Sequence, residues 1–159
     1  MKILYTAFKG KTNSSKLILD HIVASNKLYL TNSFKTSVAE LQNELKKGNY
    51  DLIVSLGQAP LDKDIIKLET VATDKTKYIT SYDYSNLYNK LKEEYKVILS
   101  SNAGNYLCNN IYYHGFKFID DNKFKTKMIF IHIPKEDKIT DIDKLAKMIK
   151  EGVDPNEWK

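Results

Sequence analysis

The sequence contains no arginine, a single cysteine and no long hydrophobic segment, and each absence excludes a class of protein. One cysteine, Cys108, cannot form an internal disulfide, and no CxxC motif or cysteine–histidine cluster indicates a zinc site. No segment approaches the roughly 20 apolar residues of a membrane-spanning helix. The N-terminal MKILYTAF has one lysine and too short an apolar run for a signal peptide. We therefore expect a cytoplasmic protein that needs no metal or other cofactor.

All 25 basic residues are lysines, which argues against nucleic-acid binding despite the net charge of +5. Lysine lacks the planar guanidinium fork that favours phosphates and guanine edges. The lysines are also interspersed among 20 acidic residues, as in NELKKG and NKLKEEY, and form no stripe. This pattern is typical of a solvated surface, so we predict no nucleic-acid partner.

Short apolar runs alternate with helical patterns along the chain. The predicted strands cover residues 2–8, 27–31, 51–57, 96–102 and 127–134, with a further candidate at 68–73. The predicted helices cover residues 14–25, 37–48, 85–95, 105–115 and 140–152. Several strands are almost continuously apolar, which suits burial on both faces. The alternation predicts a mostly parallel sheet with helices on both faces, and the absence of linkers and repeats predicts one domain over residues 1–159.

Cys108 lies in the stretch GNYLCNNIYYHG, where a predicted strand leads through a short loop into the first turn of a helix. Sites in open sheets of this class collect at the carboxyl ends of strands. The unpaired N–H groups and the positive dipole end of a helix start favour a thiolate, so we expect the pKa of Cys108 to lie below ~8.5. The same N–H groups could hold an oxyanion. A small buried structural cysteine is the alternative interpretation.

His132 and Glu69 are the residues that could cooperate with this cysteine. His132 lies inside the apolar strand IFIHIP, where its ring must be hydrogen-bonded in the core or directed to a site at the strand end. Glu69 could orient such an imidazole and complete a Cys-His-acid set. We expect the strand that holds His132 to lie beside strand 96–102. The residues alone leave the mutual geometry open.

Four segments occur in the order of the signature blocks of pyroglutamyl peptidase I, also called pyrrolidone-carboxylate peptidase. They are LGQA (56–59), ETVA (69–72), AGNYLCN (103–109) and FIHIP (130–134). The interval from Cys108 to His132 matches the interval in that family. MKILYTAF and SFKTSVAEL resemble its opening strand and its second helix entry. The chain thus resembles a shortened member of this family over almost its whole length.

The resemblance implies a three-layer α/β/α sandwich with a mostly parallel central sheet. It also implies a cysteine peptidase that removes an N-terminal pyroglutamyl residue from a small peptide or amide substrate. Carried over by position, Cys108 is the nucleophile, His132 is the general base and then acid, and Glu69 is the orienting carboxylate. The family forms tetramers, which leaves a homo-oligomer open. The positions near the bound pyroglutamyl ring correspond to Gln58, Tyr106 and Phe8.

The sequence departs from the family pattern around the substrate pocket. The PFGG after the opening strand is missing, and the arginine expected after the ETVA block is absent, with Lys75 or Lys77 as candidate substitutes. Gln58 and Glu69 are one residue further apart than in the family pattern. We expect one ring nitrogen of His132 to face Glu69, with Glu69 the triad member most prone to be out of place. Two alternatives remain open. One is a cysteine hydrolase for a different small amide, and the other is a non-catalytic binding or scaffold domain of the same fold.

Overall fold

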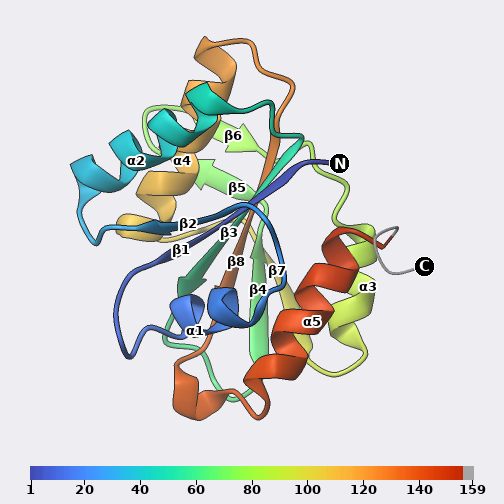
Figure 1. Cartoon of the computed structure of the whole chain (residues 1–159). Coiled ribbons are helices and arrows are strands. Elements are labelled where there is room, and N and C mark those ends of the chain that lie inside the picture. Colours follow the sequence, from blue (N-terminus) through green and yellow to red (C-terminus); the bar gives the residue numbers. More distant parts are fainter. Residues whose placement is uncertain (156–159) are drawn as a thin grey trace.

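A six-stranded sheet forms the centre of the protein in the computed structural model, which describes residues 1–155 (Figure 1). The strands lie in the order β2-β1-β3-β8-β4-β7. Their bounds are β1 (Ile3–Phe8), β2 (Lys27–Leu30), β3 (Leu52–Gln58), β4 (Ile65–Glu69), β7 (Lys96–Ser100) and β8 (Lys127–Ile133). Two shorter strands, β5 (Val71–Thr73) and β6 (Lys77–Ile79), pair as a separate antiparallel hairpin.

The sheet is mostly parallel, as predicted. Strands β2, β1, β3 and β8 run parallel, and β4 is antiparallel to β8 but parallel to β7. The prediction that the His132 strand lies beside strand 96–102 is wrong, because β4 lies between them. Within β4, Ile66 and Leu68 are fully buried and alternate with Lys67 and Glu69. An alternating strand of this kind gives a weaker signal than a continuous apolar run.

Helices cover both faces of the sheet, which confirms the α/β/α sandwich (Figure 1). They are α1 (Ser14–His21), α2 (Phe34–Lys47), α3 (Ser85–Lys92), α4 (Leu107–Asp121) and α5 (Ile142–Val153), with a short 3₁₀ turn at Glu136–Lys138. Helix α5 contacts both α1 and α3 on one face, and α2 and α4 pair on the other, where α4 also contacts β5. Each face has its own hydrophobic cluster. Within residues 1–155, no helix has the length and apolar character needed to cross a membrane.

The start of α4 differs from the starts of α1, α2 and α5. Asn13, Ser33 and Asp141 each accept a hydrogen bond from a first-turn N–H of α1, α2 and α5. The residue before α4 is Tyr106, which makes no side-chain cap. The first N–H groups of α4 have no intrahelical acceptor, so they remain available to another oxygen.

Helix α4 continues to Asp121, beyond the predicted end at residue 115. Gly115 does not end the helix. It lets α4 approach β8 closely, because a Cβ at this position would lie 2.6 Å from Met128 Sδ.

Candidate active site

The candidate site is a cavity of about 390 Å³ at the carboxyl ends of β3 and β8, beneath the start of α4. That volume is suited to a small ligand. The cavity brings together five of the six residues predicted from the sequence. They are Cys108, His132, Glu69, Gln58 and Tyr106. Further walls come from Ala59, Pro60, Leu61, Lys67 and the loop of residues 102–105.

The imidazole of His132 is held by the carboxylate of Glu69. His132 Nδ1 lies 2.7 Å from Glu69 Oε2, and the two residues are only 7% and 1% exposed. An ionised carboxylate can only accept, so Nδ1 carries the hydrogen and Nε2 is the basic nitrogen of the neutral ring. The expectation that one ring nitrogen of His132 faces Glu69 is therefore confirmed, and Glu69 is not out of place. The antiparallel pairing of β4 with β8 sets Glu69 opposite Phe130 and diagonal to His132.

The backbone of Glu69 is fixed from two sides. The buried Tyr112 hydroxyl, on α4, donates to the Glu69 carbonyl oxygen at 2.7 Å. The next residue, Thr70, donates its N–H to the Ser100 carbonyl oxygen at 2.8 Å. The second carboxylate oxygen, Glu69 Oε1, is buried and has no hydrogen-bond partner among the described residues. Glu69 can thus accept one further hydrogen bond while it holds the imidazole.

Cys108 is the second residue of α4, so its predicted place in a first helical turn is confirmed. Its sulfur packs on the backbone of Gly57, where an added Cβ would lie 2.6 Å from Sγ. Gly57 is in turn the register partner of His132 on the neighbouring strand. The Cys108 sulfur and the His132 imidazole therefore occupy adjacent positions in one cavity. Among the hydrogen bonds of the described residues, 1–155, none joins these two side chains.

The electrostatics of Cys108 differ from the expectation. Burial raises the pKa of the thiol to about 12, and the negative charge of Glu69 adds to the rise. The prediction of a lowered pKa is wrong, because loss of hydration disfavours the thiolate more than the helix start favours it. The raised pKa favours the neutral thiol, from which a base must take the proton for the sulfur to react.

Of the predicted ring-binding residues, two line the cavity and one lies beneath it. Gln58 Oε1 accepts the N–H of Ser14 at 2.9 Å, which leaves the amide nitrogen to donate. Tyr106 is 67% exposed beside the cavity. Phe8 is only 3% exposed and does not line the cavity. It belongs instead to the hydrophobic cluster against which Cys108 packs.

Lys67 is a cavity residue that the sequence analysis missed. It stands directly opposite His132 in the β4–β8 pair and has no ion-pair partner among the described residues. Neither Lys75 nor Lys77, the candidates for the missing arginine, lines this cavity. The signal was available, because Lys67 lies two residues before Glu69 and so shares its face of a strand.

Comparison with known sequences identifies relatives of one kind. The model of the family described as pyroglutamyl peptidase matches residues 62–152. The pyrrolidone-carboxylate peptidase of Thermosipho melanesiensis is 29% identical, over 84% of this chain and 83% of that protein. Pyrrolidone-carboxylate peptidase 1 of Caldanaerobacter subterraneus subsp. tengcongensis is 28% identical, over 84% of this chain and 82% of that protein.

Solved structures share the fold. Pyroglutamyl peptidase I of Bacillus amyloliquefaciens superposes with a TM-score of 0.83 at 21% identity, covering 96% of this chain and 94% of that one. The pyrrolidone carboxyl peptidase of Fervidobacterium islandicum gives a TM-score of 0.83 at 22% identity, with 99% of both chains covered. The family model spans more than half of the sequence and includes Glu69, Cys108 and His132. The chain belongs to the pyroglutamyl peptidase family.

Proposed function

We propose that this protein is a cysteine peptidase that hydrolyses the amide bond after an N-terminal pyroglutamyl residue. Membership of the pyroglutamyl peptidase family supports this activity. The observation that carries the catalytic assignment is the 2.7 Å contact between His132 Nδ1 and Glu69 Oε2, in the cavity that also contains Cys108. A carboxylate-oriented imidazole beside a thiol is the arrangement that nucleophilic catalysis by cysteine requires.

In the proposed first stage, Cys108 Sγ attacks the pyroglutamyl carbonyl carbon while His132 Nε2 takes the thiol proton. Glu69 stabilises the imidazolium that forms. The oxyanion accepts hydrogen bonds from the uncapped N–H groups at the start of α4. His132 then gives the proton to the leaving nitrogen as the carbon–nitrogen bond breaks, which leaves a thioester on Cys108.

In the second stage, water attacks the thioester carbonyl and His132 Nε2 accepts its proton. Collapse of this intermediate breaks the carbon–sulfur bond, releases pyroglutamate and returns the proton to the sulfur. Burial raises the pKa of Cys108 and so disfavours the thiolate before attack, and we assign proton transfer to His132 Nε2 to the same step as attack. The chemistry requires a reduced thiol, which supports a cytoplasmic location.

Substrate recognition is assigned to the residues around the cavity. The free amide nitrogen of Gln58 donates to the lactam carbonyl of the ring, and Tyr106 covers the ring from the rim. Phe8 supports this side of the cavity from the hydrophobic cluster beneath Cys108. These roles follow the resemblance to the family.

The test is a turnover assay on pyroglutamyl-aminomethylcoumarin, with the prolyl analogue, which lacks the ring carbonyl, as a specificity control. Wild type should release the fluorophore from the pyroglutamyl compound only, and Cys108→Ala should release none. A folded wild-type protein without turnover would favour the scaffold alternative. Turnover that survives in Cys108→Ala would reject the nucleophile.

A further inference from the structure

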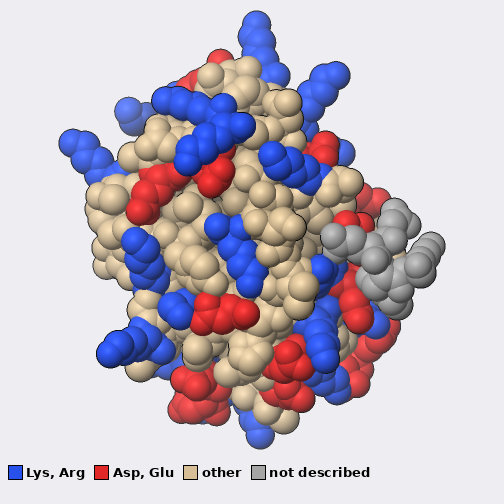
Figure 2. All heavy atoms as spheres, in the orientation of Figure 1, with Lys and Arg blue, Asp and Glu red and all other residues tan. Residues whose placement is uncertain are grey.

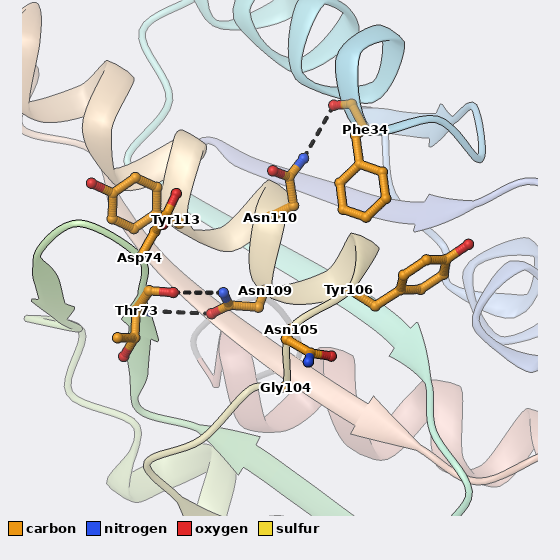
Figure 3. A pocket seen from close by; sticks show the side chains of 9 residues that line it. All are labelled: Phe34, Thr73, Asp74, Gly104, Asn105, Tyr106, Asn109, Asn110 and Tyr113. Atoms are coloured by element: carbon orange, nitrogen blue, oxygen red, sulfur yellow. Dashed lines mark hydrogen bonds between the residues drawn. The ribbon is translucent and has the colours of Figure 1, made fainter.

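A second cavity, of about 290 Å³, adjoins the candidate active site at the start of α4 (Figure 3). The two cavities share Gly104, Asn105 and Tyr106, which form the loop and cap before the helix. Cys108 lines the first cavity only, and its neighbour Asn109 lines the second. A group bonded to a carbonyl at the Cys108 sulfur can therefore extend past Tyr106 into the second cavity.

The walls of this second cavity are fixed to α4 from opposite sides (Figure 3). Asn109 Oδ1 accepts the Thr73 N–H at 3.1 Å, and its Nδ2 donates to the Thr73 carbonyl at 2.7 Å. Asn110 Nδ2 donates to the Phe34 carbonyl oxygen at 3.1 Å. The rings of Phe34 and Tyr106 meet edge to face at 5.3 Å. These contacts fix Thr73 and Phe34, on opposite sides of the cavity, to α4.

The chemistry of the walls suits a cation. Asp74 is the one charged residue that lines the cavity, and its carboxylate has no ion pair among residues 1–155. No lysine lines it, although the chain has 25. The Asn110 side-chain oxygen remains free to accept, and Phe34, Tyr106 and Tyr113 contribute aromatic rings. Carboxylate and amide oxygens beside aromatic rings attract ammonium and guanidinium groups.

We propose that this cavity binds the side chain of the residue after the scissile bond, and that Asp74 makes it select lysine or arginine there. The proposal rests on the proposed peptidase function. A volume of about 290 Å³ accommodates one side chain and not a longer peptide segment. The face of the molecule drawn in Figure 2 shows lysines and acids intermixed, so a local cavity with one unpaired carboxylate gives selectivity that the general surface does not.

The experiment measures kcat/KM for three pyroglutamyl dipeptide amides whose second residue is lysine, methionine or glutamate. Methionine matches lysine closely in length and lacks the charge. An exposed charge pair contributes up to about 1 kcal/mol, so wild type should favour lysine over methionine by about 3- to 5-fold and over glutamate by about 10-fold. High salt should reduce both ratios. Pyroglutamyl-aminomethylcoumarin, which lacks a second amino-acid side chain, reports the basal activity.

Asp74→Asn should bring the three rates within about 2-fold of one another through loss of the charge. The matched control is Asp120→Asn, an exposed carboxylate near the far end of α4, which should keep the wild-type ratios. Equal wild-type rates on the three peptides, with the coumarin compound cleaved, would overturn the cation pocket and leave the peptidase standing. Selectivity that persists in Asp74→Asn would equally overturn it. If wild type cleaves none of the compounds, the proposed function itself fails.

Discussion

The sulfur of Cys108 rests on the backbone of Gly57, the residue that pairs with His132 on the adjacent strand. A built Cβ at residue 57 would lie 2.6 Å from the sulfur and 2.7 Å from the Phe130 ring. The glycine therefore sets how deeply the thiol enters the cavity and how close it comes to the imidazole. The GQA block of the sequence has a steric role in addition to supplying Gln58.

Gly57→Ala should displace the sulfur and destabilise the fold. Overpacking of a tight interior costs about 1–3 kcal/mol, and misplacement of the nucleophile should lower kcat by about 100-fold. Urea unfolding and the turnover assay measure the two effects. Gly48→Ala is the control, because the Cβ there meets the flexible end of Lys2 and should leave kcat unchanged. A fully active Gly57→Ala enzyme would contradict the packing argument.

Glu69→Gln should preserve the shape of the site and remove the charge that stabilises the imidazolium. The amide can also present its N–H₂ to Nδ1, which reverses the tautomer of His132. By analogy with orienting carboxylates in other triads, kcat should fall by about 10³-fold or more. Glu94→Gln, a change at an exposed residue paired with Lys144, should leave kcat unchanged. A fall below 10-fold would show that Glu69 has only a packing role.

Lys67→Met should weaken substrate binding, because it removes the unpaired ammonium group in the cavity wall. A hydrogen bond from a charged donor contributes about 1.5–3 kcal/mol, so kcat/KM should fall by at least about 10-fold. The comparison variant is Lys77→Met on the exposed strand β6, for which we expect a change of less than about 2-fold. If Lys77→Met has the larger effect, Lys77 has replaced the missing arginine after all.

The half-buried thiol of Cys108 should make the free energy of unfolding depend on alkaline pH. The pKa of Cys108 rises from 9.0 to about 12 on folding, so the folded state favours the neutral form. The contribution of the neutral thiol to the free energy of unfolding is complete below pH 9.0. It is lost as the pH rises toward 12, because in that range the thiol ionises only in the unfolded chain. The stability of wild type relative to Cys108→Ala should fall by about 1 kcal/mol between pH 8 and pH 10. Urea unfolding of both proteins at each pH measures this change. A difference in stability that does not vary with pH would show that the thiol is solvated in the folded protein.

The fold and most of the site could be predicted from the sequence, because the main strands are uninterrupted apolar runs and the site residues lie in short contiguous motifs. The apolar runs that became β1, β3 and β8 identified the parallel part of the sheet, and the AGNYLCN and FIHIP blocks located Cys108 and His132 at its edge. The antiparallel position of β4 between β8 and β7 was not predictable. Its alternating residues resemble an edge strand, and no local feature of the sequence sets the direction of the strand.

Two further features depend on tertiary packing. The raised pKa of Cys108 follows from burial against Gly57 and from the charge of Glu69, neither of which is visible around residue 108 in the sequence. Phe8 matched a ring-binding position by sequence, yet the structure buries it in the hydrophobic cluster beneath the cavity. In both cases the sequence motif identified the residue along the chain but did not show how deeply the fold buries its side chain.

The central claim is that Cys108 forms a covalent bond to the pyroglutamyl group. The direct measurement is rapid acid quenching of the enzyme during turnover of an activated pyroglutamyl ester, followed by peptide mass spectrometry. The account predicts a pyroglutamyl thioester on the peptide that contains Cys108, and none in Cys108→Ala. Product release from wild type without any modification of Cys108, or with the group on another residue, would contradict it.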